Sequence, residues 1–169
     1  MTEDVVIHCE SGIEDGDTRR PGAAHRVRSH EERTRDMTAE RSAINPVTWS
    51  TELGFNQGEL VIDSTRTLYI SGQTAMSGDG VPMHEDDMAG QIGSSLDNVE
   101  AVLAAAEMTL ADLVRLTVYT TDVDRLFPHY GVLAARLGAA GAAPATTMLG
   151  VTRLAIPGQL VELEATAVR

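Results

Sequence analysis

The sequence predicts a single α+β domain built on one mixed β-sheet with two helices on one face. Two apolar stripes at helical spacing lie among short strand-like segments, in the order strand, strand, helix, strand, helix, strand, strand. A strand–helix–strand crossover therefore occurs twice, and crossovers of one hand place both helices on the same side of the sheet. We expect the other, uncovered face to be apolar and buried against a neighbouring copy, which predicts an oligomer.

The first 36 residues differ from the rest of the chain. They contain nine acidic residues and six arginines, and neither a helical nor a strand period runs through them. Such a segment buries too little apolar surface to offset the entropy lost on ordering. The sequence therefore predicts a disordered N-terminal extension over residues 1–36 and one domain over residues 37–169.

The strand signals are short runs bounded by turn residues. The predicted strands are residues 59–63, 67–71, 113–120, 145–152 and 160–168. The polar Ser64–Arg66 segment predicts a hairpin between the first two, and Pro157–Gly158 predicts a turn between the last two. Gly72 ends the second strand, where a glycine lets backbone approach a ligand closely.

Each helix has an apolar stripe and a candidate cap. The stripes are Ile92, Leu96, Val99, Leu103 and Ala106 in the first helix, and Leu126, Tyr130, Leu133 and Leu137 in the second. Asp86 or Asp87 is expected to cap the first helix, and Asp122 or Asp124 the second. Thr109 and Asp112 have the spacing of a capping box on a short turn.

Charge and composition exclude several classes of function. The formal net charge is -12, and residues 37–169 contain sixteen acidic residues against seven arginines. Nucleic-acid binding needs a basic surface, so we expect no nucleic-acid partner. There is one cysteine, the N-terminus is acidic, and no run of 18 apolar residues occurs. We therefore expect no membrane partner and a reducing, cytoplasmic location.

Four stretches resemble, in the right order, motifs of the RidA/YjgF family of reactive-intermediate deaminases, which is also labelled endoribonuclease L-PSP. They are Ser71–Gln73, Ser95–Val102, Leu113–Asp122, and Pro144–Ala145 together with Val161–Ala167. The resemblance covers nearly all of residues 44–169. It implies a chorismate-mutase-like α+β fold, and a homotrimer that holds a small-molecule ligand in each inter-subunit cleft. It also implies hydrolysis of 2-imino acids to 2-oxo acids and ammonia, without a cofactor or metal.

The chain departs from this family at one position. The deaminases carry an arginine directly after the Pro-Ala pair, where this sequence has Thr146. A guanidinium holds a carboxylate through two parallel hydrogen bonds, which threonine cannot do. We therefore expect a substrate other than a 2-imino acid. Arg153 is the nearest substitute, but strand alternation places it on the opposite face from Thr146 unless Gly150 forms a bulge; Arg115 and Arg125 are weaker alternatives.

The resemblance also assigns roles to other positions. Glu162 matches a glutamate thought to position or activate water, and Glu164 shares its strand face. The implied substrate-binding residues are Phe55, Gly72, Tyr130, Thr146 and Met148. Core packing is the alternative for the two aromatic residues, and an ordinary surface or interface carboxylate is the alternative for Glu162. His129, beside Tyr130, is expected to be exposed, and Asp97 and Asn98 are expected to make helix-surface and loop hydrogen bonds.

No metal site is predicted. His8, Cys9, His25 and His30 have no zinc-ligand spacing. His84 lies beside Glu85–Asp87, and a solvated helix cap is favoured over a metal site there. The chain also lacks a nucleophilic triad or a glycine-rich phosphate loop.

Two functions follow from these observations. The first is hydrolysis of an imine, enamine or related small-molecule C–N bond, with water held by Glu162 and by backbone near Gly72 and Met148. The second is a non-catalytic trimer that binds a small ligand or regulates a partner, because Phe55, Thr146 and Met148 would make the cleft more apolar than that of a deaminase. A third function, ribonuclease, is disfavoured by the acidic charge balance.

Overall fold

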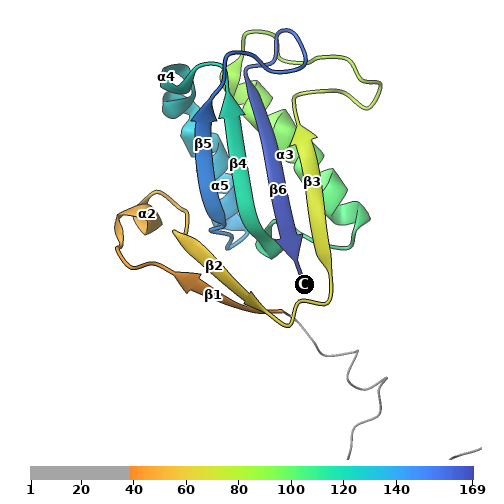
Figure 1. Ribbon diagram of the computed structural model, residues 1–169. Helices are drawn as coiled ribbons and strands as arrows, with labels where there is room; N and C mark the ends of the chain where they lie inside the picture. Colours follow the sequence, from red (N-terminus) through yellow and green to blue (C-terminus); the bar gives the residue numbers. More distant parts are fainter. Residues whose placement is uncertain (1–38) are drawn as a thin grey trace, which may run out of the picture.

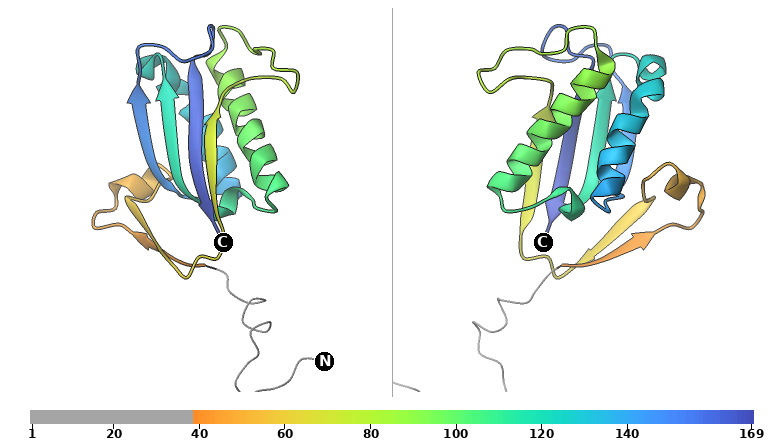
Figure 2. Two further views of the ribbon diagram at one scale, coloured as in Figure 1. Left: turned by 45° about the vertical axis from the view of Figure 1, so that its right-hand side comes forward. Right: turned by 180° about the vertical axis from the view of Figure 1, so that it is seen from behind.

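A four-stranded sheet with two helices on one face forms the body of the domain (Figure 1). The computed structural model describes residues 39–169, so the predicted extension over residues 1–36, with its histidines and cysteine, lies outside the described residues. The strand order is β3 (Thr67–Gln73), β6 (Val161–Val168), β4 (Leu113–Thr120) and β5 (Ala145–Gly150). Figure 2 shows α3 (Met88–Ala105) and α5 (Tyr130–Ala139) on the same face. The predicted α+β class, mixed sheet and one-sided helices are confirmed.

The pairing of the strands differs from the expected hairpins. β4 and β5 pair in parallel across the α5 crossover, while β6 runs antiparallel between β3 and β4. The last two strands therefore do not pair with each other, although they are neighbours in sequence. The predicted hairpin between residues 59–63 and 67–71 is also wrong, because β2 (Gly58–Ile62) pairs with β1 (Glu40–Ile44).

The helix caps agree with those predicted from the sequence. Asp87 caps α3 by accepting from the Gly90 amide, and Asp122 caps α4 (Val123–Leu126) by accepting from the Arg125 amide. The expected second helix is interrupted by a 3-10 turn at Phe127–His129 before α5 begins. Pro128 explains the interruption, since it has no amide hydrogen to donate to the helix. The predicted capping box is confirmed in the 3-10 turn Leu110–Asp112.

A separate two-stranded hairpin lies beside β5 (Figures 1 and 2). It consists of β1 and β2 with the short helix α2 (Trp49–Glu52) between them. Arg41 donates to the carbonyl of Leu113 at 2.7 Å, and the Asn56 amide donates to the carbonyl of Ala143 at 3.1 Å. These bonds attach the hairpin to the body of the domain at the first residue of β4 and shortly after the last residue of α5.

The two faces of the main sheet have different chemistry. On the helix side, the buried side chains are Leu116 and Val118 of β4 with Val161, Leu163, Ala165 and Ala167 of β6. The register pairs Thr117 with Glu164 and Tyr119 with Glu162, so these residues share the open face. The expectation of a bare apolar face is therefore wrong. The exposed large apolar residues are instead concentrated in the β1–α2–β2 hairpin.

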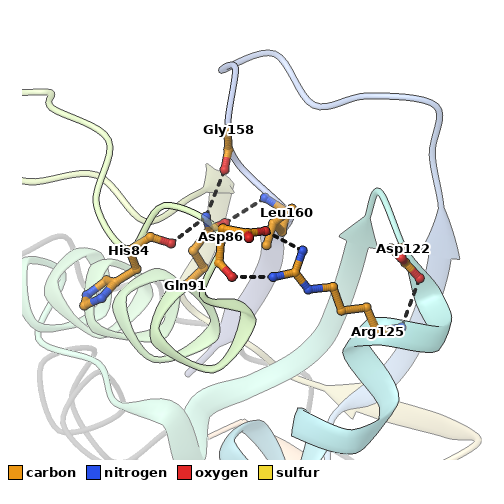
Figure 3. A network of polar contacts seen from close by, with 7 residues as sticks. All are labelled: His84, Asp86, Gln91, Asp122, Arg125, Gly158 and Leu160. Atoms are coloured by element: carbon orange, nitrogen blue, oxygen red, sulfur yellow. Dashed lines mark hydrogen bonds and ion pairs between the residues drawn. The ribbon is translucent and has the colours of Figure 1, made fainter.

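Two loops are fastened together at the end of the sheet by a buried glutamine (Figure 3). The Gln91 side chain, which is 0% exposed, donates to the carbonyls of His84 and Gly158 at 3.0 and 2.9 Å. Its oxygen accepts from the Leu160 amide at 2.7 Å. The loop that precedes α3 is thereby joined to the loop that leads into β6.

No helix among residues 39–169 has the length and apolar character that crossing a membrane requires.

Candidate functional site

A cavity of about 490 Å³ lies where the hairpin meets the edge of the main sheet and α5. It is lined by Trp49, Leu53, Phe55, Phe127, Tyr130, Gly131, Thr146 and Met148. Four of the five residues predicted to bind substrate therefore come together, namely Phe55, Tyr130, Thr146 and Met148. We call this cavity the aromatic pocket.

Local structure explains why these residues meet. β5 is an edge strand, and its register pairs Thr146 with Leu116 and Met148 with Val118, which face the helices. Their side chains consequently point toward the start of α5, where Tyr130 lies half-buried. Gly54, with a φ of 82°, allows the chain to turn after α2 and bring Phe55 beside Trp49. These two rings meet edge to face with centroids 5.7 Å apart.

A second pocket, of about 340 Å³, contains the other predicted residues. It is lined by Gly72, Tyr119, Val151, Arg153, Leu154, Ala155, Glu162 and Glu164. We call it the carboxylate pocket. It contains the proposed catalytic Glu162 and the fifth predicted binding residue, Gly72.

Glu162 and Gly72 fit together closely. The register between β3 and β6 shifts between Ile70 and Gln73, which places an extra residue of β3 opposite β6. A Cβ added to Gly72 in this bulge would lie 1.7 Å from Oε1 of Glu162. The Glu162 carboxylate therefore occupies the space that a side chain at position 72 would need, whereas the sequence suggested close approach of a ligand.

Two tyrosines near these pockets have perturbed acidity. The Tyr119 hydroxyl donates to Oε2 of Glu164 at 2.6 Å, and this hydrogen bond is the main reason why the pKa of Tyr119 is raised. Burial raises the pKa of Tyr130. Both phenols are consequently neutral near pH 7, and Glu164 is engaged with Tyr119.

The two pockets lie on opposite faces of the sheet. Thr146 and Met148 face the helices, while Glu162 is paired with Tyr119 on the open face. One chain therefore does not bring Glu162 to Thr146. The predicted site is divided into two halves.

None of the three alternative arginines lines the aromatic pocket. Arg153 lines the carboxylate pocket, but β5 ends at Gly150, so the predicted strand alternation does not extend to Arg153. Arg115 donates to Oγ1 of Thr147 at 2.8 Å, and Arg125 forms an ion pair with Asp86 at 2.7 Å. No cation therefore lines this chain's aromatic pocket in place of the arginine that other family members carry at the position of Thr146.

The remaining predicted polar residues have structural partners. Asp97 forms an ion pair with Arg136 at 2.5 Å, and Asn98 donates to the carbonyls of Thr74 and Met76 at 2.9 and 3.1 Å. His129 is exposed, as expected. Among residues 39–169, no group of three or more His, Cys, Asp or Glu side chains is placed to hold a metal ion.

Sequence reasoning missed half of the aromatic pocket. Trp49, Leu53, Phe127 and Gly131 line it, but none of them was predicted. α2 has only four residues, which is too short for a periodic signal, and Phe127 lies outside the apolar stripe of the second helix. The usable signal was composition, because the chain has one tryptophan and two phenylalanines and all three line this cavity.

Comparison with known proteins supports the family resemblance. The family model described as Endoribonuclease L-PSP matches residues 51–169. The RutC family protein YjgH of Escherichia coli is 32% identical over 116 residues, which cover 69% of this chain and 87% of that protein. Protein DfrA of Myxococcus xanthus is 31% identical over 111 residues, which cover 63% of this chain and 79% of that protein.

Solved structures agree with this assignment. YyfB of Yersinia pestis, from the Rid protein family, is 36% identical with a TM-score of 0.67, covering 76% of this chain and 98% of its own. Escherichia coli TdcF, solved with bound serine, is 28% identical with a TM-score of 0.57, covering 75% of this chain and 91% of its own. The match of family model, sequence and fold shows that this chain belongs to the RidA/YjgF family.

Proposed function

We propose that this chain is a RidA-type hydrolase that cleaves the C–N bond of a small imine or enamine in a cleft shared by two copies of the chain, within a homotrimer. The observation that carries the proposal is the division of the site. Phe55, Tyr130, Thr146 and Met148 line one pocket, while Glu162 and Gly72 line another on the opposite face of the sheet.

A cyclic assembly would join these two halves. In a closed ring, each interface brings one surface of a chain against a different surface of its neighbour. The aromatic pocket of one chain would then face the carboxylate pocket of the next. The exposed apolar residues of the hairpin, such as Ile44, Leu60 and Ile62, favour its burial in such an interface. A cytoplasmic location remains part of the proposal and rests on the single cysteine.

The chemistry needs only a positioned water and a proton carrier. The oxygen of water attacks the imine carbon while Glu162 accepts a proton from that water. The proton is passed to the imine nitrogen, which gives a carbinolamine. The C–N bond then breaks, the amine or ammonia leaves, and a carbonyl product remains. Tyr119 holds Glu164 through a hydrogen bond, so Glu162 is the carboxylate available for proton transfer.

Non-catalytic ligand binding is the second candidate. The observation that favours it is the state of Thr146, whose hydroxyl donates to the Pro144 carbonyl at 2.9 Å. The residue that replaces the family arginine therefore has no hydrogen left to offer a substrate. An apolar pocket of this kind can bind a ligand without acting on it.

Thr146→Arg is expected to raise the rate of hydrolysis of 2-iminopropanoate by at least about tenfold. The arginine can form two charge-assisted hydrogen bonds with the substrate carboxylate, whereas Thr146 forms none. The measurement is imine decay in a coupled reaction with an amino-acid oxidase. Thr146→Lys is the matched control, since it adds the charge without the bidentate geometry and should gain less.

The same assay separates the two candidate functions. If the native protein or Thr146→Arg accelerates decay, the catalytic half of the proposal holds. If neither the native protein nor Thr146→Arg hydrolyses 2-iminopropanoate or an imine without a carboxylate, hydrolysis is rejected in favour of ligand binding.

A further inference from the structure

Most of the chain's aromatic side chains gather in one cavity. The chain has one tryptophan, two phenylalanines and three tyrosines; the tryptophan, both phenylalanines and Tyr130 line the aromatic pocket. Trp49 and Phe127 remain 58% and 61% exposed. Their ring surfaces are therefore available to a ligand, and aromatic rings bind one another in edge-to-face or offset arrangements.

The aromatic pocket has no charged residue in its lining. Its one titratable group is Tyr130, whose raised pKa, caused by burial, keeps it protonated. Thr146 has already donated its hydroxyl hydrogen to Pro144. A carboxylate in this pocket would lose its hydration without gaining a cation or a free donor from Thr146, which is a costly exchange.

The carboxylate pocket is also unfavourable for an anion. Glu162 and Glu164 line it together with a single cation, Arg153. A neutral or cationic group suits these two acids better than a carboxylate does, because like charges repel.

We infer that the cleft takes an arylalkyl imine that carries no carboxylate, with its ring in the aromatic pocket and its C=N group toward the Glu162 of a neighbouring copy. This inference rests on the proposed function of the shared cleft. A cavity of about 490 Å³ has room for a phenyl ring and a short alkyl chain. Hydrolysis would convert R–CH=NH and water to the aldehyde R–CHO and ammonia.

The chemistry of this substrate fixes the reaction that supplies it. An aldimine of this kind forms when an oxidase removes two electrons and two protons from a primary arylalkylamine and passes them to dioxygen, giving hydrogen peroxide. The class of reaction upstream is therefore oxidation of a primary amine. The aldehyde product would be consumed by oxidation to an acid or reduction to an alcohol.

The single tryptophan gives a direct binding test. Trp49 lines the aromatic pocket, so its fluorescence reports ligands there without any need for catalysis. The full-length protein is titrated with 2-phenylethylamine and with phenylalanine, which differ by one carboxylate. We expect 2-phenylethylamine to bind at least about tenfold more tightly, a difference of ~1.4 kcal/mol. Equal binding, tighter binding of phenylalanine, or no response to either ligand overturns the inference.

Two variants locate the response. Phe127→Ala should weaken 2-phenylethylamine binding by about tenfold through loss of one ring contact. Val81→Ala should leave it unchanged, since Val81 is 57% exposed and outside the pocket. An unchanged affinity in Phe127→Ala would show that the ligand binds elsewhere and would overturn the inference.

An oxidase-coupled assay separates this inference from the proposed function. An amine oxidase generates the imine of 2-phenylethylamine, and its decay is followed with and without the protein. Selective binding without faster decay supports the ligand class and rejects the hydrolase. Faster decay of 2-iminopropanoate, together with preferred binding of phenylalanine, supports the hydrolase and rejects the ligand class.

Discussion

Glu162→Gln is expected to lower the rate of imine hydrolysis by about 10²–10⁴-fold, because the amide cannot accept the proton of the attacking water. The substitution keeps the shape of the side chain beside Gly72, so the fold should persist. The measurement is the initial rate of imine decay, with a thermal melt to verify the fold. A rate within about threefold of the native protein would exclude Glu162 as the base.

Gly72→Ala provides an independent test of the same carboxylate. Its Cβ would lie 1.7 Å from Oε1 of Glu162, a contact that the flexible side chain must relieve by moving away. The expected rate loss is therefore similar to that of Glu162→Gln, with little loss of stability. Gly93→Ala is the matched control, because no atom lies within 4 Å of its added Cβ. Full activity in Gly72→Ala would show that hydrolysis does not depend on the position that Glu162 takes against this glycine.

Gln91→Leu is expected to destabilise the domain by about 3 kcal/mol, because it removes three hydrogen bonds that are worth about 1 kcal/mol each. Leucine has nearly the same volume, so the loss reports the three hydrogen bonds to His84, Gly158 and Leu160. The measurement is denaturant unfolding at one protein concentration, since assembly alters apparent stability.

Gln57→Leu is the control for that experiment. Its side chain makes no hydrogen bond among residues 39–169, so it should change stability by less than about 1 kcal/mol. Equal effects of the two substitutions would show that Gln91 does not fasten the two loops.

The elements that the sequence predicted best are those with strong local signals. The capping side chains of Asp87 and Asp122 each accept a hydrogen bond from an amide three residues further along the chain. The apolar stripe of α3 repeats over an 18-residue helix. Strand pairing failed because it depends on distant residues. β6 inserts between β3 and β4, which no local turn signal at Pro157–Gly158 could indicate. β1 was missed because its residues show no alternation of apolar and polar side chains, and α2 was missed because four residues are too few for a helical period.

The sequence predicted part of the lining of the site but not its arrangement. The family motifs selected Phe55, Tyr130, Thr146 and Met148, which line one pocket. Motifs do not reveal strand register, however, and register places Glu162 on the other face of the sheet. The exposed Trp49 and Phe127 were missed because apolar periodicity identifies residues that face the core.

The most direct test of the shared cleft is to mix two variants, each of which damages one half of the site. Trp49→Ala/Phe127→Ala damages the aromatic pocket through two exposed residues, and Glu162→Gln damages the carboxylate pocket. Each variant alone should be nearly inactive on the imine that the native protein hydrolyses. In trimers formed from an equal mixture, about a quarter of the clefts combine two intact halves, so about a quarter of native activity should return. Activity no higher than that of the two parents would contradict a cleft shared between copies.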